Sequence, residues 1–342
     1  MKKIIKFLKT DIKIINSYFL FTIILIILVC VGYSSYALFS FTKTSNNVIE
    51  GTVGELKKSG VDTLIKLTDN TNDSGLYTIT HPADNTLQIG ATESVTEYRY
   101  RGANPKNYVT FNNGVWRILG VFPTDDGTGN IENRIKLIRN ESIGNKAWNS
   151  NNTNNWTEAT LKKELNETYL NSLTSEAQKM IGNTKYYLGG KNVTYNNGYA
   201  DTPLQFYSYE RKIQNTTSNE FYNGTNPNSW VGKLGLMYVS DYGYASSNCE
   251  NKRIYDYNSS ANDIRVCNDT NWLYNIKDNE WILPQNAGTS NRAFYVNSNG
   301  HVNYNFVVYN GQFAVRPVLY LTSSVKITGG NGTSSSPYTL GL

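Results

Sequence analysis

The chain has 342 residues, of which 13% are aromatic and only 17% are charged, and its formal net charge is +5. A disordered chain would be poor in aromatic residues, so this composition predicts a folded protein. Five lysines and Asp11 lie in the first 17 residues, and without them the net charge falls to +1. Electrostatics therefore exclude the remainder of the chain as a nucleic-acid-binding protein.

The first part of the chain has the features of a membrane-targeting segment. Residues 18–39 contain no charged side chain, and a stretch of about 20 apolar residues is long enough for a helix to cross a bilayer. Residues 1–17 form a basic segment that we expect to stay in the cytoplasm, so the C-terminal side emerges outside. The sequence thus predicts a signal anchor at 18–39, which is the contact with the lipid bilayer of a single-pass protein in the cell membrane.

A cleavable signal peptide is the alternative interpretation of the same residues. Ser35 and Ala37 are small residues at the positions that signal peptidase recognises. Cleavage after Ala37 would secrete the rest of the chain. The apolar core at 18–33 is slightly longer than the roughly 7–15 residues of a signal peptide, which favours the retained anchor.

Residues 40–95 are polar and irregular, and we expect them to form a stalk or leading arm. Within it, the loose spacing of apolar residues in 53–67 predicts one short helix. From residue 96 the apolar pattern becomes regular, and residues 96–342 are predicted to form one extracytoplasmic domain. The near-continuous apolar run at 115–122 and the alternating segment at 134–139 predict a hairpin with its turn at residues 123–127.

Two helices are predicted next in the chain. Asn155 is a suitable N-cap for the first helix, and Thr174 or Ser175 begins the second. The segment 234–240 is predicted as a buried strand, and Asn299-Gly300 predicts a tight hairpin turn between 293–296 and 301–304. A late strand at 313–321 contains Pro317, which favours a sheet edge or a bulge. Two helices placed early among many short strands predict an α+β fold.

Cys249 and Cys267 are the two cysteines beyond the predicted anchor. In an oxidising space they are most simply read as one disulfide that closes a loop. A redox or metal pair is the less favoured reading, because there is no CxxC motif and His81 and His301 are far away in sequence.

Six separated blocks occur in order along the chain: YRYRGANP at 98–105, NYV at 107–109, NNGVWRILGVF at 112–122, GLMYVSDYGYA at 235–245, NWL at 271–273 and VRPVLYL at 315–321. Together they resemble an uncharacterised family of single-pass surface proteins of low-GC Gram-positive bacteria. The two helices, the tryptophan-containing strand and the closing strand are also similar to the C-type-lectin-like group, which includes domains related to formylglycine-generating enzymes. This second resemblance implies a compact C-type-lectin-like domain with a loop-rich binding region, but a fold does not by itself imply a ligand.

The resemblance to formylglycine-generating enzymes calls for two reactive cysteines close together near the C-terminus. Cys249 and Cys267 are widely spaced and precede the closing strand, so we expect no catalytic residues and no enzymatic activity. No cofactor is expected either. Calcium is an option in lectin-like domains, but the acidic loop at 125–130 lacks the alternating order of an EF-hand, so no metal ligand is assigned.

Aromatic residues near predicted loops are the candidates for ligand contacts, because exposed tyrosine and tryptophan side chains stack on sugar rings and anchor interfaces. Core packing is the alternative role for each tryptophan. The candidate ligand-facing residues are Asp241, Tyr242, Tyr244, Trp148 and Trp230. Arg316 lies within an apolar strand and is expected to pair with a buried carboxylate, for which Asp241 is the suggested partner.

These observations predict a membrane-anchored extracytoplasmic binding or adhesion protein that recognises a glycan or a surface protein. One alternative is a secreted enzyme related to formylglycine-generating enzymes, or a hydrolase. A second alternative is a structural subunit of a surface appendage.

Overall fold

The computed structural model describes Leu25, Ile26 and Leu28 and the ranges 59–83, 93–192, 202–211, 226–254, 266–275 and 277–342. The contacts between residues divide the chain into two compact units, Met1–Leu56 and Lys57–Leu342. Leu25, Ile26 and Leu28 are helical and exposed, and the basic segment and the remainder of the predicted anchor lie outside the described residues. Across the described ranges, no helix combines the length and the apolar character needed to cross a membrane.

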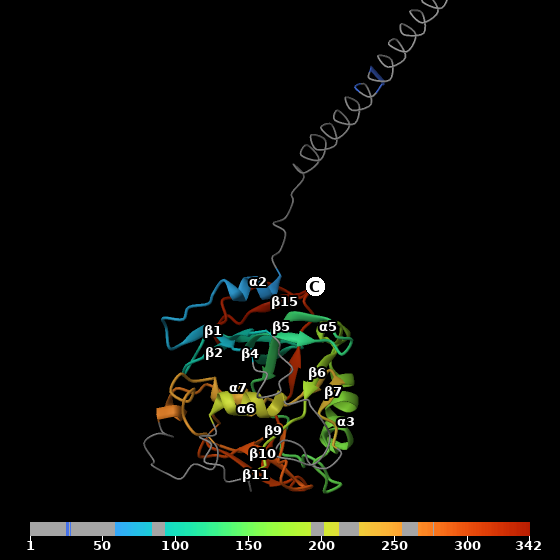
Figure 1. The fold of residues 1–342 in the computed structure, drawn as a ribbon, viewed down its shortest axis with the longest axis vertical. Helices are drawn as coiled ribbons and strands as arrows, with labels where there is room; N and C mark the ends of the chain where they lie inside the picture. Colours follow the sequence, from blue (N-terminus) through green and yellow to red (C-terminus); the bar gives the residue numbers. More distant parts are fainter. Residues whose placement is uncertain are drawn as a thin grey trace, which may run out of the picture. The chain divides into compact units, whose positions relative to one another are not determined.

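The main sheet of the second unit has seven strands in its described part, in the order β1-β2-β4-β5-β13-β8, with β3 paired to β4 (Figure 1). The strands are β1 Gly75–His81, β2 Val95–Arg101, β3 Tyr108–Phe111, β4 Gly114–Asp125, β5 Ile131–Arg139, β8 Leu234–Gly235 and β13 Val318–Tyr320. The predicted hairpin is confirmed by β4 and β5. Its turn begins later than predicted, because Pro123 still pairs with Asn133. Strand β1 is part of this sheet although it lies within residues 40–95.

A second sheet has four strands in the described residues, in the order β11-β10-β9-β12. They are β9 Asn279–Gln285, β10 Arg292–Val296, β11 Val302–Phe306 and β12 Phe313–Ala314. The hairpin predicted around Asn299-Gly300 is confirmed by β10 and β11, and Gly300 has a φ of 86°, which favours glycine. Two small sheets pair β6 Thr184–Tyr187 with β7 Ser229–Gly232, and β14 Lys326–Gly329 with β15 Thr339–Gly341.

The helices are short. They are α2 Gly60–Ile65, η1 Trp156–Glu158, α3 Thr160–Lys163, η2 Glu164–Tyr169, α4 Leu170–Ser172, α5 Ser175–Met180, α6 Pro203–Arg211 and α7 Val239–Gly243. Asn155 caps η1 as predicted, and its Oδ1 accepts a hydrogen bond from the Thr157 N–H at 3.1 Å. The first predicted helix is present but divided, because η1 is a 3₁₀ turn and η2 is a π-helical turn. Thr174 caps α5, as predicted.

Two predicted strands differ from the structure. The strand predicted at 234–240 ends at Gly235, and α7 begins at Val239, because the Asp241 carboxylate accepts a hydrogen bond from the Tyr238 N–H at 2.8 Å and turns the chain into a helix. The strand predicted at 313–321 is divided between the two sheets on either side of Pro317. Since Pro317 has no N–H group to donate, the ladder breaks there. Strand β13 lies between β5 and β8 rather than at an edge.

Helices α6 and α7 lie between the seven-stranded sheet and the four-stranded sheet (Figure 1). Phe206 of α6 packs edge-on against Phe294 of β10, with ring centroids 5.9 Å apart. Toward the other sheet, Arg99 of β2 forms an ion pair with Asp241 of α7 at 3.0 Å. The predicted class is therefore confirmed as a mixed α+β domain with mostly antiparallel strands and few short helices.

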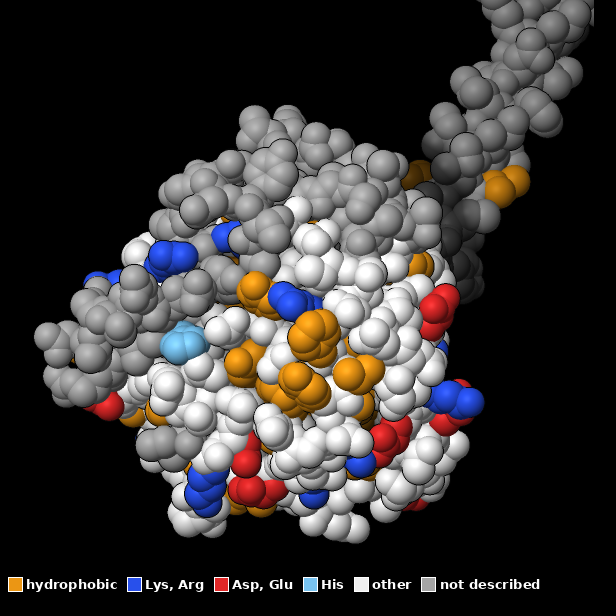
Figure 2. Space-filling model, turned by 90° about the horizontal axis from the view of Figure 1, so that it is seen from below, with side chains coloured by type: hydrophobic (Ala, Val, Ile, Leu, Met, Phe, Trp, Pro, Cys, Tyr) orange, Lys and Arg blue, Asp and Glu red, His pale blue; other side chains and the backbone are white. Residues whose placement is uncertain are grey.

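Figure 2 shows the surface from below the view of Figure 1, the side on which the four-stranded sheet lies. Hydrophobic side chains gather near the middle of this face (Figure 2). On β10 and β11, Tyr295, Tyr304 and Phe306 are half-buried, and Tyr309 beyond them is 45% exposed. Arg292 lies 4.4 Å from the centroid of the Phe306 ring. Contacts with neighbouring residues thus hold these aromatic residues in place, and Tyr309 is the most exposed of them, with its ring edge-on to Phe306 at 6.0 Å.

The predicted disulfide joins Cys249 and Cys267, whose Cα atoms are 5.0 Å apart. Both residues are buried. Replacing both cysteines by alanine should lower the free energy of unfolding by about 3 kcal/mol, because the unfolded chain regains the freedom that the cross-link removes. Urea unfolding of the full chain in detergent, followed by tryptophan fluorescence, measures this loss. The prediction would be contradicted if the variant, the reduced wild type and the oxidised wild type all had the same free energy of unfolding.

Candidate functional site

Ionisable side chains from five elements meet in the interior next to α6 and α7. We call this set the buried charge cluster; it consists of His81, Glu97, Arg99, Lys136, Glu210, Arg211 and Asp241. None of these residues is more than 8% exposed. Burial of a charge is costly unless the charge is paired and hydrogen-bonded, so the contacts of each group decide what the cluster can do.

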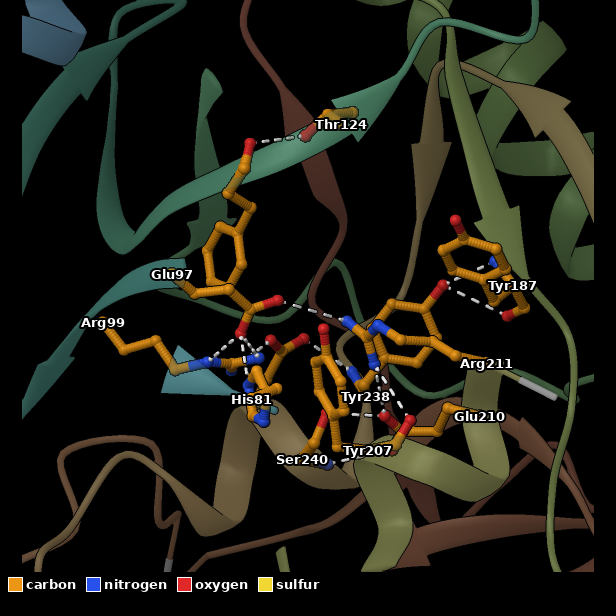
Figure 3. Close-up of polar contacts among 12 residues, drawn as sticks. His81, Glu97, Arg99, Thr124, Tyr187, Tyr207, Glu210, Arg211, Tyr238 and Ser240 are labelled. Carbon is orange, nitrogen blue, oxygen red and sulfur yellow. Dashed lines mark hydrogen bonds and ion pairs between the residues drawn. The ribbon is translucent and has the colours of Figure 1, made fainter. Parts of the chain in front are cut away.

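Three charged or titratable side chains contact the Glu97 carboxylate of β2. Its Oε2 accepts a hydrogen bond from the Arg99 Nε at 2.9 Å and lies 3.2 Å from the His81 Nε2. Its Oε1 lies 3.7 Å from an Arg211 nitrogen. Figure 3 shows Arg211 between Glu97 and Glu210. The His81 ring is stacked on Tyr207, with centroids 3.6 Å apart.

Asp241 of α7 connects the helix to two strands of the main sheet. Its Oδ1 accepts a hydrogen bond from the Arg99 Nη1 at 3.0 Å, and its Oδ2 forms an ion pair with the Lys136 Nζ of β5. Burial alone would raise the pKa of Asp241, but the charges of Lys136 and Arg99 bring it below its ordinary value. The Asp241 carboxylate is therefore charged at neutral pH, and it joins β2, β5 and α7.

Glu210 and Lys136 have pKa values that burial moves toward neutrality. Burial raises the pKa of Glu210 to about 7, although its Oε1 accepts a hydrogen bond from the Ser240 N–H at 2.9 Å and its Oε2 lies 3.1 Å from the Arg211 Nη1. Burial lowers the pKa of Lys136 to about 8. Both groups can therefore exchange a proton close to physiological pH, which is unusual for ordinary glutamate and lysine side chains.

A cavity of ≈ 190 Å³ opens beside the cluster. Four tyrosines line it, namely Tyr187, Tyr207, Tyr238 and Tyr320. Two ion pairs also line the cavity: Glu97 with Arg211, which are buried, and Asp125 with Lys185, whose Oδ2 and Nζ atoms are 3.3 Å apart and more exposed. Aromatic surface with a few oriented polar groups also lines small-molecule binding sites, but those sites hold about 300–1,000 Å³, so this cavity suits only a small group such as one sugar ring.

The structure does not bring the predicted ligand-facing residues to this cavity. Asp241, Tyr242, Tyr244 and Trp148 are at most 3% exposed and do not line the cavity, so their role as ligand-facing residues stays a prediction. Their polar atoms serve the interior: the Tyr242 hydroxyl donates to the Gly300 carbonyl at 2.6 Å, and the Trp148 Nε1–H donates to the Ile282 carbonyl at 3.2 Å.

Trp230 is half-buried and does not line the cavity. Its ring is stacked on Tyr186, with centroids 5.6 Å apart, and meets Trp156 edge-on at 6.3 Å. These ring contacts fit the core-packing role that is the alternative for each tryptophan, and a ligand contact of Trp230 stays a prediction.

The predicted buried partner of Arg316 is present, but it is a different residue. Arg316 forms two hydrogen bonds to Glu280, at 2.8 and 2.7 Å. Asp241 was the wrong partner, because Arg99 and Lys136 already occupy its carboxylate.

The residues predicted from the sequence do not include Glu97, Arg211, Lys185 or Tyr187. Glu97 was recognisable from the sequence, because charged residues alternate with aromatic residues in its strand. Charged residues in such a strand are rarely buried unless they are paired. The position of Arg211, four residues after Tyr207 on one helix, was a second signal.

The acidic loop after β4 is a hairpin turn. Asp125 Oδ1 accepts hydrogen bonds from the N–H groups of Gly127 and Gly129, at 2.8 and 3.1 Å, and Asp126 accepts one from Thr128. One carboxylate oxygen each of Asp125 and Asp126 thus holds the turn. In the part of the chain that the structure describes, no group of three or more His, Cys, Asp or Glu side chains is placed to hold a metal ion.

The fold and the site define an α+β domain with an open cavity beside a buried charge cluster. Residues 132–323 match the family described as Domain of unknown function (DUF6273). Since the match spans more than half of the chain, the protein belongs to this family. No curated protein and no solved structure matches the chain. The match includes Lys136, Glu210 and Asp241 of the cluster, whereas Glu97 and Arg99 precede it.

Proposed function

We propose that the chain is a single-pass, membrane-anchored binding or adhesion protein whose extracytoplasmic domain recognises a glycan and catalyses no reaction. The observation that carries this proposal is the cavity of ≈ 190 Å³ with its four tyrosines and two ion pairs. The more exposed of these groups are Tyr187 and the Asp125–Lys185 pair. Tyr187 offers an aromatic face with a polar tip, and the ion pair offers a donor and an acceptor. A sugar ring presents the complementary surface, with apolar C–H faces and hydroxyl groups around its edge.

The location and the finer fold belong to the same proposal. The basic and apolar N-terminal segments support membrane anchoring, and the buried Cys249–Cys267 disulfide supports an oxidising exterior location. The antiparallel strands, short helices and loop-rich connections support a C-type-lectin-like domain.

Binding of the full chain in detergent to an immobilised glycan array, with and without calcium, tests the function. We expect a restricted set of glycans to bind. The calcium arm separates direct recognition by the cavity from recognition through a metal ion. Absence of binding to every glycan, by a preparation with native tryptophan fluorescence, would overturn the glycan proposal and leave a protein ligand as the candidate.

Replacing Tyr187 by alanine should weaken binding of any glycan found on the array about fivefold, because a lost aromatic contact costs ~1 kcal/mol. The Tyr187 side chain lines the cavity, while its backbone N–H and carbonyl hold the Tyr238 hydroxyl and remain in the variant. Tyr309→Ala is the matched control, since Tyr309 is exposed and does not line the cavity. Equal loss in both variants would place the ligand elsewhere.

A further inference from the structure

The contact between Lys136 and Asp241 combines a primary amine with a carboxyl group in the interior. The two residues are 105 positions apart in the chain, and their side chains are 1% and 0% exposed. The buried pairs Arg99–Glu97 and Arg316–Glu280 instead use guanidinium groups, which stay charged and are poor nucleophiles. A lysine amine becomes a nucleophile as soon as it loses its proton.

The rings of three aromatic residues lie around the Lys136 ammonium group, and the positive charges of Arg99 and Arg211 also act on it. Its Nζ lies 5.3, 4.7 and 5.2 Å from the ring centroids of Phe122, Tyr238 and Tyr320. Burial in these surroundings lowers the pKa of Lys136 to about 8. The neutral, reactive amine is therefore reached at a much smaller free-energy cost than for a lysine in water.

The Asp241 carboxyl group is held in a fixed position by two further donors. The Arg99 Nη1 donates to Oδ1 at 3.0 Å, and the Tyr238 N–H donates to Oδ2 at 2.8 Å. Because Asp241 is ionised, one ammonium proton of Lys136 first passes to Oδ2. When the neutral amine then adds to Cγ, negative charge collects on Oδ1, where the Arg99 guanidinium group stabilises it. Lys136 Nζ contacts the other oxygen, Oδ2, which is the oxygen that can leave.

We propose that Lys136 and Asp241 join spontaneously through an intramolecular isopeptide bond. A bond forms between Lys136 Nζ and Asp241 Cγ, and the bond between Cγ and Oδ2 breaks. Two of the three protons of the ammonium group end on Oδ2, which departs as water, and the third remains on the amide nitrogen. The ammonium and carboxylate charges cancel, so atoms, protons and charge balance without an oxidant, a reductant or another reactant.

The fold supplies the conditions that this condensation lacks in water. Two groups held in contact react as if at a very high effective concentration, because no entropy is lost in bringing them together. The product replaces two buried charges, whose desolvation is costly, by one neutral amide. The released water leaves an interior that excludes solvent, which opposes hydrolysis of the new bond.

The bond would connect β5 of the seven-stranded sheet covalently to α7 of the helix layer. It would close a far longer loop than the Cys249–Cys267 disulfide and, unlike the disulfide, would survive reduction. Neither Lys136 nor Asp241 lines the cavity, so the isopeptide bond does not depend on glycan binding.

Peptide mapping of the purified full chain tests the proposal. After reduction, denaturation and trypsin digestion, an unmodified chain gives cleavage after Lys136 and a separate peptide 234–252 that contains Asp241. We expect instead that peptide 135–139 remains uncleaved at Lys136 and is joined to 234–252, with a combined mass lower by that of one water molecule. Fragmentation should locate the link at Lys136 and Asp241.

Lys136→Arg keeps a buried cation but removes the reactive amine, and Asp241→Ala removes the carboxyl group; both should lose the linked species entirely. Glu280→Gln is the matched control, because it disturbs another buried pair and should leave the link intact. If the first two variants fail to fold, the wild-type digest still decides the question. Complete cleavage after Lys136 in the wild type, with a free peptide 234–252, would overturn the proposal.

Discussion

Replacing Arg316 by methionine should lower the free energy of unfolding by about 3–5 kcal/mol, because the variant leaves the Glu280 carboxylate buried without its cation. Glu280 is 2% exposed, and burial raises its pKa. Arg316 also donates a hydrogen bond to the Leu273 carbonyl at 2.9 Å, which the variant loses. Urea unfolding of the full chain in detergent, followed by tryptophan fluorescence, measures the loss.

The double variant Arg316→Met/Glu280→Gln is the control for this prediction. It removes both charges together, so most of the stability lost in Arg316→Met should return, since a neutral pair no longer pays the cost of an isolated buried charge. A single variant that loses less than about 1 kcal/mol, the range of an exposed ion pair, would show that Glu280 does not depend on Arg316.

The stability of the wild type should fall by about 3 kcal/mol relative to Glu210→Gln as the pH rises from 4.5 to 7. Burial raises the pKa of Glu210 from 4.5 to about 7. In this window the folded state keeps a proton that the unfolded state releases, so rising pH favours unfolding. Below pH 4.5 both states are protonated, and above the folded pKa both are ionised, so the difference levels off on either side.

Urea unfolding of both proteins at several pH values within this window checks the sign and the size. The lowered pKa of His81 acts in the opposite direction, since stability then rises as the unfolded histidine loses its proton. That contribution is present in both proteins and cancels in their difference. A difference that does not change with pH would mean that Glu210 is ionised in the folded state throughout.

Features that depend on neighbouring residues were predictable. The hairpins at β4–β5 and β10–β11 follow from alternating apolar residues and from the Asn299-Gly300 turn, and the caps Asn155 and Thr174 follow from their own side chains. Each of these signals acts over a few residues, so no knowledge of the rest of the chain is needed.

Segments 234–240 and 313–321 show where local patterns fail. Both are apolar enough for a strand, but an apolar run also suits any other buried element. In the first segment, the contacts of the buried Asp241 side chain favour the helix α7 over a longer strand. In the second, Pro317 divides the run between two sheets.

The sequence by itself determined the α+β class, the two hairpins and the Cys249–Cys267 pairing, because composition, alternation and the number of cysteines are properties of the chain. Only the tertiary structure decided that Arg316 pairs with Glu280, that Asp241 is buried between Arg99 and Lys136, and that Tyr187 and Arg211 line a cavity. The physical reason is separation along the chain: Arg99 and Lys136 lie 142 and 105 residues from Asp241. A buried charged residue pairs with whichever opposite charge the fold brings near. A local sequence pattern does not indicate which residue that is.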